Sequence, residues 1–71
     1  MNSHAPALKK IGQNIRRIRI EKGIKQEYVA TKLGVTKSAI SRIENGDRDT
    51  TLKNILQIAT VLDVAAIDFF G

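Results

Sequence analysis

The segment KQEYVATKLGVTKSAISRIENG, residues 25–46, predicts two short helices joined by a tight turn. The first of them, near residues 26–33, would have one apolar face, made of Val29, Ala30 and Leu33. Gly34 can then adopt the left-handed backbone conformation that commonly ends a helix. Because Thr36 is a residue type that caps helix N-termini, we expect a second helix near residues 37–44.

Two short helices around a glycine turn match the layout of a helix-turn-helix, whose second helix enters the major groove of DNA. Ala30 is small where two such helices must approach closely, and Val35 and Ile40 are apolar where the second helix docks on the first. An ordinary pair of antiparallel helices without any ligand would have the same spacing. The spacing therefore favours a DNA-binding element without establishing it.

Apolar residues continue at helical spacing on both sides of this segment. Before it, a helix is predicted over about residues 8–22, with Gly23 as its stop. The apolar face of that helix would consist of Leu8, Ile11, Ile15 and Ile18. After the segment, Thr51 can cap a helix over residues 52–62, and a last short helix is expected near residues 65–70. The inward stripe of the fourth helix would consist of Leu52, Ile55, Ile58, Ala59 and Leu62.

These elements predict an all-α fold, a compact five-helix bundle in which helices 2 and 3 form the helix-turn-helix. With 71 residues, we expect a frayed N-terminus at residues 1–6 and a single domain over residues 7–71. The chain has no cysteine, which excludes disulfides and cysteine-ligated metals. Its first residues lack the apolar stretch of a secretory signal, and no apolar run approaches the ~18 residues of a membrane span, so we expect a cytoplasmic protein.

Charge is distributed unevenly along the chain, which has a net charge of +5. Residues 1–42 contain ten Lys and Arg against two Glu, whereas residues 43–71 contain two basic and five acidic residues. A basic first part and an acidic second part favour one surface for a polyanion and another surface turned away from it.

Residues that could support catalysis are scarce. His4 is the only histidine, and neither Ser38 nor Ser41 has a neighbouring base to activate it. Asp47 and Asp49 flank a basic residue in a turn, and we interpret them as solvated. We therefore expect no enzymatic activity, no cofactor and no metal site.

Three stretches carry a resemblance to a known family: IGQNIRRIRIEKG (residues 11–23), the segment of residues 25–46, and TLKNILQIATVLDV (residues 51–64). Over about residues 11–70 the chain resembles the phage-repressor-like helix-turn-helix family, also called XRE-type or lambda-repressor-like. The resemblance implies a five-helix bundle and a sequence-specific transcriptional regulator. Restriction–modification controllers and small phage repressors of this kind bind near-palindromic operators in double-stranded DNA as homodimers. The alternative is an antitoxin-like or adaptor module that mainly binds a protein partner.

The resemblance also assigns roles to individual residues. It implies DNA contacts by Gln26, Thr36, Lys37, Ser38, Ser41, Arg42, Asn45 and Arg48. Arg42 is the strongest candidate for base recognition, because arginine can pair with guanine through two hydrogen bonds. Gln26 falls where family members bond a phosphate and brace the recognition helix. For each of these residues, a plain solvated side chain is the alternative.

The chain departs from the family pattern at several positions. Lys25 stands where a Thr or Ser usually caps helix 2, so we expect that cap to be weak or absent. Asp47 and Asp49 place negative charge in a loop that is often basic. Asp63 replaces a frequent Gly and Ala65 a frequent Ser cap, so the last helix should be less firmly held.

Two structural contacts are also expected. The resemblance implies that Arg19 and Glu44 form an internal ion pair, since family members often link these two positions. A homodimer interface is expected at the C-terminal end, formed by Val61, Ile67, Phe69 and Phe70. Val61 lies away from the inward stripe of its helix. The other three residues belong to the predicted last short helix, and one face of so short a helix cannot bury all three. The alternative is that Phe69 and Phe70 close the core of the monomer.

Overall fold

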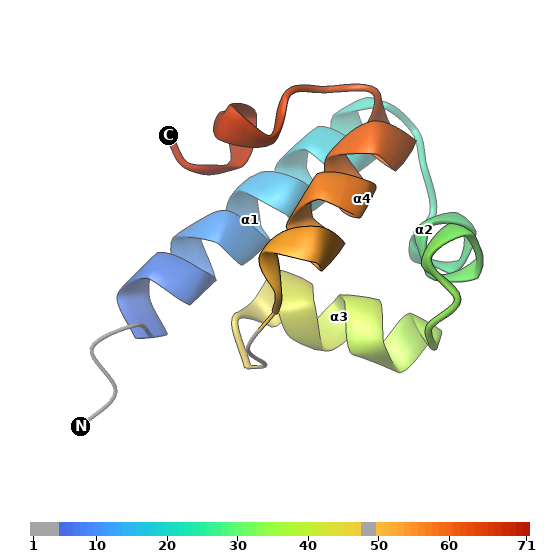
Figure 1. Cartoon of the computed structure of the whole chain (residues 1–71), viewed down its shortest axis with the longest axis horizontal. Coiled ribbons are helices and arrows are strands. Elements are labelled where there is room, and N and C mark those ends of the chain that lie inside the picture. The colour runs from blue at the N-terminus through green and yellow to red at the C-terminus, as the bar shows by residue number, and fades with distance from the viewer. Residues whose placement is uncertain (1–4, 48–49) are drawn as a thin grey trace.

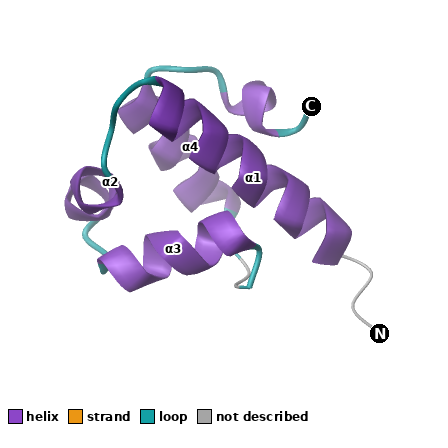
Figure 2. Ribbon diagram, turned by 180° about the vertical axis from the view of Figure 1, so that it is seen from behind, coloured by secondary structure: helices purple, strands orange, loops and turns teal. Residues whose placement is uncertain are grey.

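A computed structural model describes residues 5–47 and 50–71, and every element of regular secondary structure within these ranges is a helix. Four α-helices are followed by one 3₁₀ helix, in the order α1 (Ala5–Glu21), α2 (Gln26–Leu33), α3 (Lys37–Asn45), α4 (Leu52–Leu62) and η1 (Ala66–Phe69). Figure 1 shows α1 and α4 side by side, with α3 below them and α2 and η1 on opposite sides of α4; Figure 2 shows the same order from behind. Within the described ranges, no helix is long and apolar enough to cross a membrane.

The helix-turn-helix has the predicted bounds, since α2 begins and ends as expected and α3 is one residue longer. Gly34 ends α2 in the left-handed conformation, with φ of 71°. The Oγ1 of Thr36 accepts a hydrogen bond from the backbone N–H of Ala39 at 3.1 Å, which confirms its role as the cap of α3. Lys25 makes no side-chain cap hydrogen bond, so the expectation of a weak or absent cap on α2 is confirmed.

The prediction of five α-helices is wrong at the C-terminal end, where the last element is a single four-residue 3₁₀ helix. Its backbone bonds have the tighter i to i+3 pattern, as in Asp68 N–H to the carbonyl of Ala65 at 3.0 Å. Ala65 provides no side-chain cap, and Asp63 ends α4 in the left-handed conformation with φ of 58°. Four residues without a cap are too few for a stable α-helix, and packing holds them instead.

The frayed N-terminus predicted for residues 1–6 is partly wrong. Residues 1–4, with His4, lie outside the described part of the chain, but Ala5 and Pro6 belong to α1. Proline is tolerated there because the first N–H groups of an α-helix have no partner within the helix.

Every helix contributes to a single core. Its fully buried side chains are Ile15, Val29, Ile40, Ile58, Leu62 and Phe69. The predicted stripe of α4 is confirmed except at Leu52, which is 66% exposed. Leu52 is the first residue of α4 and lies outside the core.

The close approach of α1 to α3 depends on Gly12, whose role the sequence did not reveal. A β-carbon at this position would overlap the carbonyl oxygens of Ile43 and Glu44, the latter at 2.5 Å. Next to this point Gly46, which ends α3, leaves no room for a β-carbon beside the backbone of Lys9. The end of α3 therefore rests directly on the backbone of α1.

We expect Gly12→Ala to destabilise the protein by about 3 kcal/mol, because the clash is with backbone atoms and the two helices must separate. In an open helix the same substitution would stabilise by up to ~1 kcal/mol, so even the sign of the change is informative. Chemical denaturation measures it, with Gln13→Ala on the exposed side of the same helix as the control. A Gly12→Ala variant as stable as the wild type would contradict the close approach.

Candidate nucleic-acid interface

One side of α3 is polar and solvated, and the other side is buried. The buried side consists of Ala39, Ile40, Ile43 and Glu44. The other side consists of Lys37, Ser38, Ser41, Arg42 and Asn45, all exposed except the half-buried Ser41. At 3.6 residues per turn these five side chains fall within an arc of about 140°. All five are predicted DNA contacts, and α3 presents them together on one face.

The remaining predicted contacts lie around this arc or outside the described residues. Thr36 is exposed at the start of α3, where its hydroxyl oxygen already accepts the capping hydrogen bond. Arg48 and Asp49 are outside the described part of the chain. Asp47 is exposed just after α3, in agreement with its interpretation as a solvated side chain.

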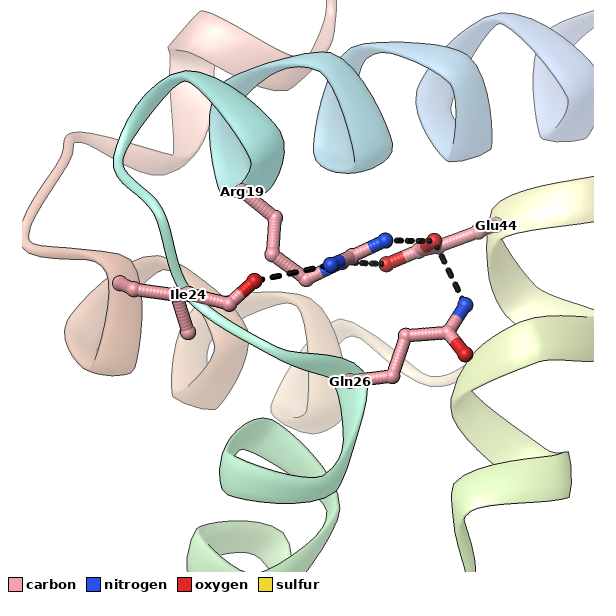
Figure 3. A network of polar contacts seen from close by, with 4 residues as sticks. All are labelled: Arg19, Ile24, Gln26 and Glu44. Atoms are coloured by element: carbon pink, nitrogen blue, oxygen red, sulfur yellow. Dashed lines mark hydrogen bonds and ion pairs between the residues drawn. The ribbon is translucent and has the colours of Figure 1, made fainter.

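A buried network links α1, the turn after it, α2 and α3 (Figure 3). Arg19 Nε donates to Glu44 Oε2 at 2.6 Å, and Arg19 Nη2 donates to Glu44 Oε1 at 3.1 Å. Arg19 Nη1 donates to the carbonyl of Ile24 at 2.8 Å. The carboxylate also accepts a hydrogen bond from Gln26 Nε2 at 3.0 Å. The structure thus brings Arg19 and Glu44 together as expected and adds Gln26 to the pair.

This network determines the orientation of the Gln26 amide. Because Nε2 must face the carboxylate of Glu44, its second N–H and the Oε1 atom remain available to other partners. Gln26 is half-buried at the start of α2, so the brace restricts its side chain while leaving part of it accessible. A glutamine held in this way can bond a phosphate at a small cost in side-chain entropy.

A shallow pocket of about 250 Å³ lies between the start of α2 and the start of α3. It is lined by Arg19, Lys25, Gln26, Glu27 and Lys37. Sequence reasoning placed Gln26 and Lys37 at a DNA interface but missed Lys25 and Glu27. The sequence did contain a signal at Lys25, a cation in place of the usual helix cap. Without a side chain that accepts a hydrogen bond there, the first N–H groups of α2 lack that partner.

The residues predicted for a dimer interface do not share one environment. The Phe69 side chain is 0% exposed and its carbonyl accepts a hydrogen bond from Asn14 Nδ2 at 2.8 Å, so its assignment to an interface is wrong. Val61, expected on the side of its helix away from the inward stripe, is half-buried, packs against the core and lines a groove beside Tyr28 of α2. Ile67 and Phe70 are 75% and 52% exposed. Leu52 and Leu56 of α4 are exposed as well.

Comparisons with known proteins agree with this geometry. A family model described as helix-turn-helix matches residues 15–69. The HTH-type transcriptional regulator y4dJ of Sinorhizobium fredii, itself uncharacterised, is 33% identical over 60 residues, which are 84% of this chain and 78% of that protein.

Among solved structures, the restriction–modification controller protein C.AhdI from Aeromonas hydrophila has a TM-score of 0.83 and 40% identity, covering 89% of this chain and 96% of its own. The wild-type controller C.Esp1396I has a TM-score of 0.79 and 38% identity, covering 90% and 83%. The chain therefore belongs to the XRE-type helix-turn-helix family, which is a family of transcriptional regulators and not a class of enzymes.

Proposed function

We propose that this protein is a sequence-specific regulator that binds a near-palindromic operator as a homodimer, in the manner of a restriction–modification controller or a small phage-type repressor. The observation that carries the proposal is the solvated arc of α3, defined by Lys37, Ser38, Ser41, Arg42 and Asn45. The nine residues of α3 span about 13 Å, a length that fits the major groove. The likeness to two restriction–modification controllers, each at about 40% identity, supports the choice of class.

In this proposal phosphate contacts set the register and base contacts give the sequence preference. Lys25 and the braced Gln26 would bond the backbone at the start of α2, because both line the pocket there. Arg42 would reach base edges from the exposed arc of α3, whereas Lys37, which begins that helix and also lines the pocket, would contact a phosphate. Arginine offers two parallel donors to the N7 and O6 acceptors of guanine.

The proposal is tested by selecting binders from a random double-stranded library and titrating the product by fluorescence anisotropy. We expect an inverted repeat whose half-sites are about 34 Å apart, one turn of DNA. If the selection enriches no particular sequence, and the protein binds DNA only weakly and loses that binding in salt, the antitoxin-like or adaptor function is favoured instead.

Arg42→Ala should weaken operator binding by about 1–3 kcal/mol per contacted base pair and relax the preference at that position. Gln26→Ala is the matched comparison, because loss of a phosphate contact should weaken binding to all sequences alike. Both variants are titrated against the operator and against single base-pair changes in each half-site. If Arg42→Ala discriminates between these sites as well as the wild type does, another residue reads the bases.

The exposed apolar residues suggest where the two protomers meet. Leu52 and Leu56 lie four residues apart on one side of α4, whereas Val61, across the helix, faces α2. Since η1 lies on the side of α4 opposite to α2 (Figures 1 and 2), we propose that the exposed Leu56 and Phe70 contribute to one apolar surface. Patches of this kind on a small domain usually mark a contact site. We therefore propose that the interface consists of Leu52, Leu56, Ile67 and Phe70. Val61 and Phe69 are no longer part of it.

Leu56→Glu should shift the protein from dimer to monomer in sedimentation equilibrium at tens of micromolar, because two carboxylates would meet across a self-complementary interface. Tyr28→Glu is the control, since Tyr28 is 51% exposed beside Val61 on the other side of α4. Loss of the dimer in Tyr28→Glu alone would return the interface to the Val61 side. A wild type that is monomeric in solution and binds its operator as one copy would overturn the homodimer.

A further inference from the structure

The pocket between α2 and α3 contains a negative charge that a DNA interface does not need. Of its lining residues, Arg19, Lys25 and Lys37 are cationic, and Glu27 is the one carboxylate. The charge of Arg19 is already neutralised by Glu44. Glu27 therefore offsets one of the two cations that remain to attract a phosphate.

Glu27 is directed at one of these cations. Its Oε1 lies 4.0 Å from Lys37 Nζ, and the two side chains are 72% and 62% exposed. Lys37 begins the recognition helix, so the contact crosses from α2 to the element that would enter the groove. Exposed pairs of long side chains exchange partners easily and are screened by salt.

We propose that Glu27 acts as an internal competitor of the DNA phosphates: it pairs with Lys37 in the free protein and must release it when DNA binds. This inference rests on the proposed function. In the free protein the carboxylate occupies the position that a phosphate oxygen would take beside Lys37. On binding, the same carboxylate remains close to the DNA backbone and repels it. Glu27 would thus hold the affinity for DNA of any sequence below the level that the basic surface could reach.

The expected size of the effect follows from counterion release. One additional cation engaged with phosphate changes the slope of log K against log salt by about −0.9. For each protomer bound, the ratio of the affinity of Glu27→Gln to that of the wild type for random-sequence duplex should therefore be about eightfold larger at 0.1 M salt than at 1 M salt. Anisotropy titrations over a salt series measure both the slope and the gain.

Glu21→Gln is the matched control. Glu21 is likewise an exposed glutamate paired with a basic residue, since its Oε1 lies 3.2 Å from Arg17 Nη1. It lies in the last turn of α1 and does not line the pocket. Both substitutions remove one negative charge and free one cation, so the excess of Glu27→Gln over Glu21→Gln isolates the effect of position.

A double-mutant cycle with Lys37→Gln tests the pairing itself. The gain from Glu27→Gln should be smaller when Lys37 is absent, because only the repulsion between the carboxylate and the DNA backbone is then relieved. Glu27 also lies in the first turn of α2, where a negative charge stabilises the helix dipole, so thermal melts verify that each variant is folded at the assay temperature.

The outcomes separate the two proposals. If the wild type binds no DNA, the proposed function fails. If the wild type binds DNA but Glu27→Gln and Glu21→Gln give the same slope and affinity, Glu27 is not a competitor, and this inference fails while the function stands. A gain that persists undiminished without Lys37 would also overturn it.

Discussion

Replacing Arg19 with Met is expected to lower the free energy of unfolding by about 3–5 kcal/mol, because it leaves a buried carboxylate without its counter-charge. The side chain of Glu44 is 1% exposed, and its two oxygens accept from Arg19 and Gln26. Without Arg19, a single amide N–H from Gln26 would have to support the negative charge. For a domain of this size such a loss is a large share of the total stability.

Glu44→Gln should cost less than Arg19→Met. The guanidinium keeps its hydrogen bond to the carbonyl of Ile24, and its side chain is 11% exposed against 1% for Glu44, so water can reach part of its charge. Thermal and urea unfolding of both variants measure the order. If both have the midpoint of the wild type, the network makes no contribution to folding.

The combination of Arg19→Met with Glu44→Leu distinguishes pairing from burial. A buried ion pair replaced on both sides by apolar groups is often neutral in stability, whereas removal of one partner is costly. We therefore expect the double variant to be more stable than Arg19→Met alone, with a coupling energy of about 1–3 kcal/mol. It should nevertheless bind DNA more weakly, because Gln26 loses the carboxylate that holds its amide.

Local signals in the sequence were sufficient to place the helices around the turn. The hydroxyl of Thr36 and the backbone freedom of Gly34 act within one turn of the residues that carry them, so they predict boundaries without reference to the rest of the fold. The same locality explains the five-helix error. Nothing near Ala65 caps an α-helix, yet the full burial of Phe69 holds the segment in place through contacts made with other elements.

Features that depend on how two elements meet could not be predicted in this way. Gly12 matters only because the end of α3 crosses α1 at that residue, and a glycine within a helical pattern gave the single hint. Leu52 is exposed and Val61 packs against the core, because α4 has different neighbours on its two sides. The exposed arc of α3 could be predicted since one helix carries it, whereas the pocket beside it combines α2 with α3 and needed the structure.

DNA affinity should depend steeply on salt. Each protomer offers at least three cations at the proposed interface, namely Lys25 and Lys37 at the pocket and Arg42 on the arc of α3. Further lysines and arginines of the basic first part of the chain, such as Lys9 and Lys10, are exposed. With about six to ten phosphates neutralised by the proposed dimer, affinity should fall by about 10³–10⁵ between 50 and 200 mM salt.

The structure also predicts which charges should not contribute to this slope. Arg19 is paired with Glu44 inside the protein. A substitution of Arg19 that keeps the fold should therefore leave the slope of DNA affinity against salt unchanged. Lys25→Gln should reduce its magnitude by about one for each protomer bound. Asp68→Asn in η1, on the opposite side of α4 from α2, should leave it unaltered (Figure 1). Anisotropy titrations at four or more salt concentrations give the slopes. Equal slopes for the wild type and Lys25→Gln would place the DNA backbone elsewhere, and a flat wild-type profile would contradict an electrostatic interface altogether.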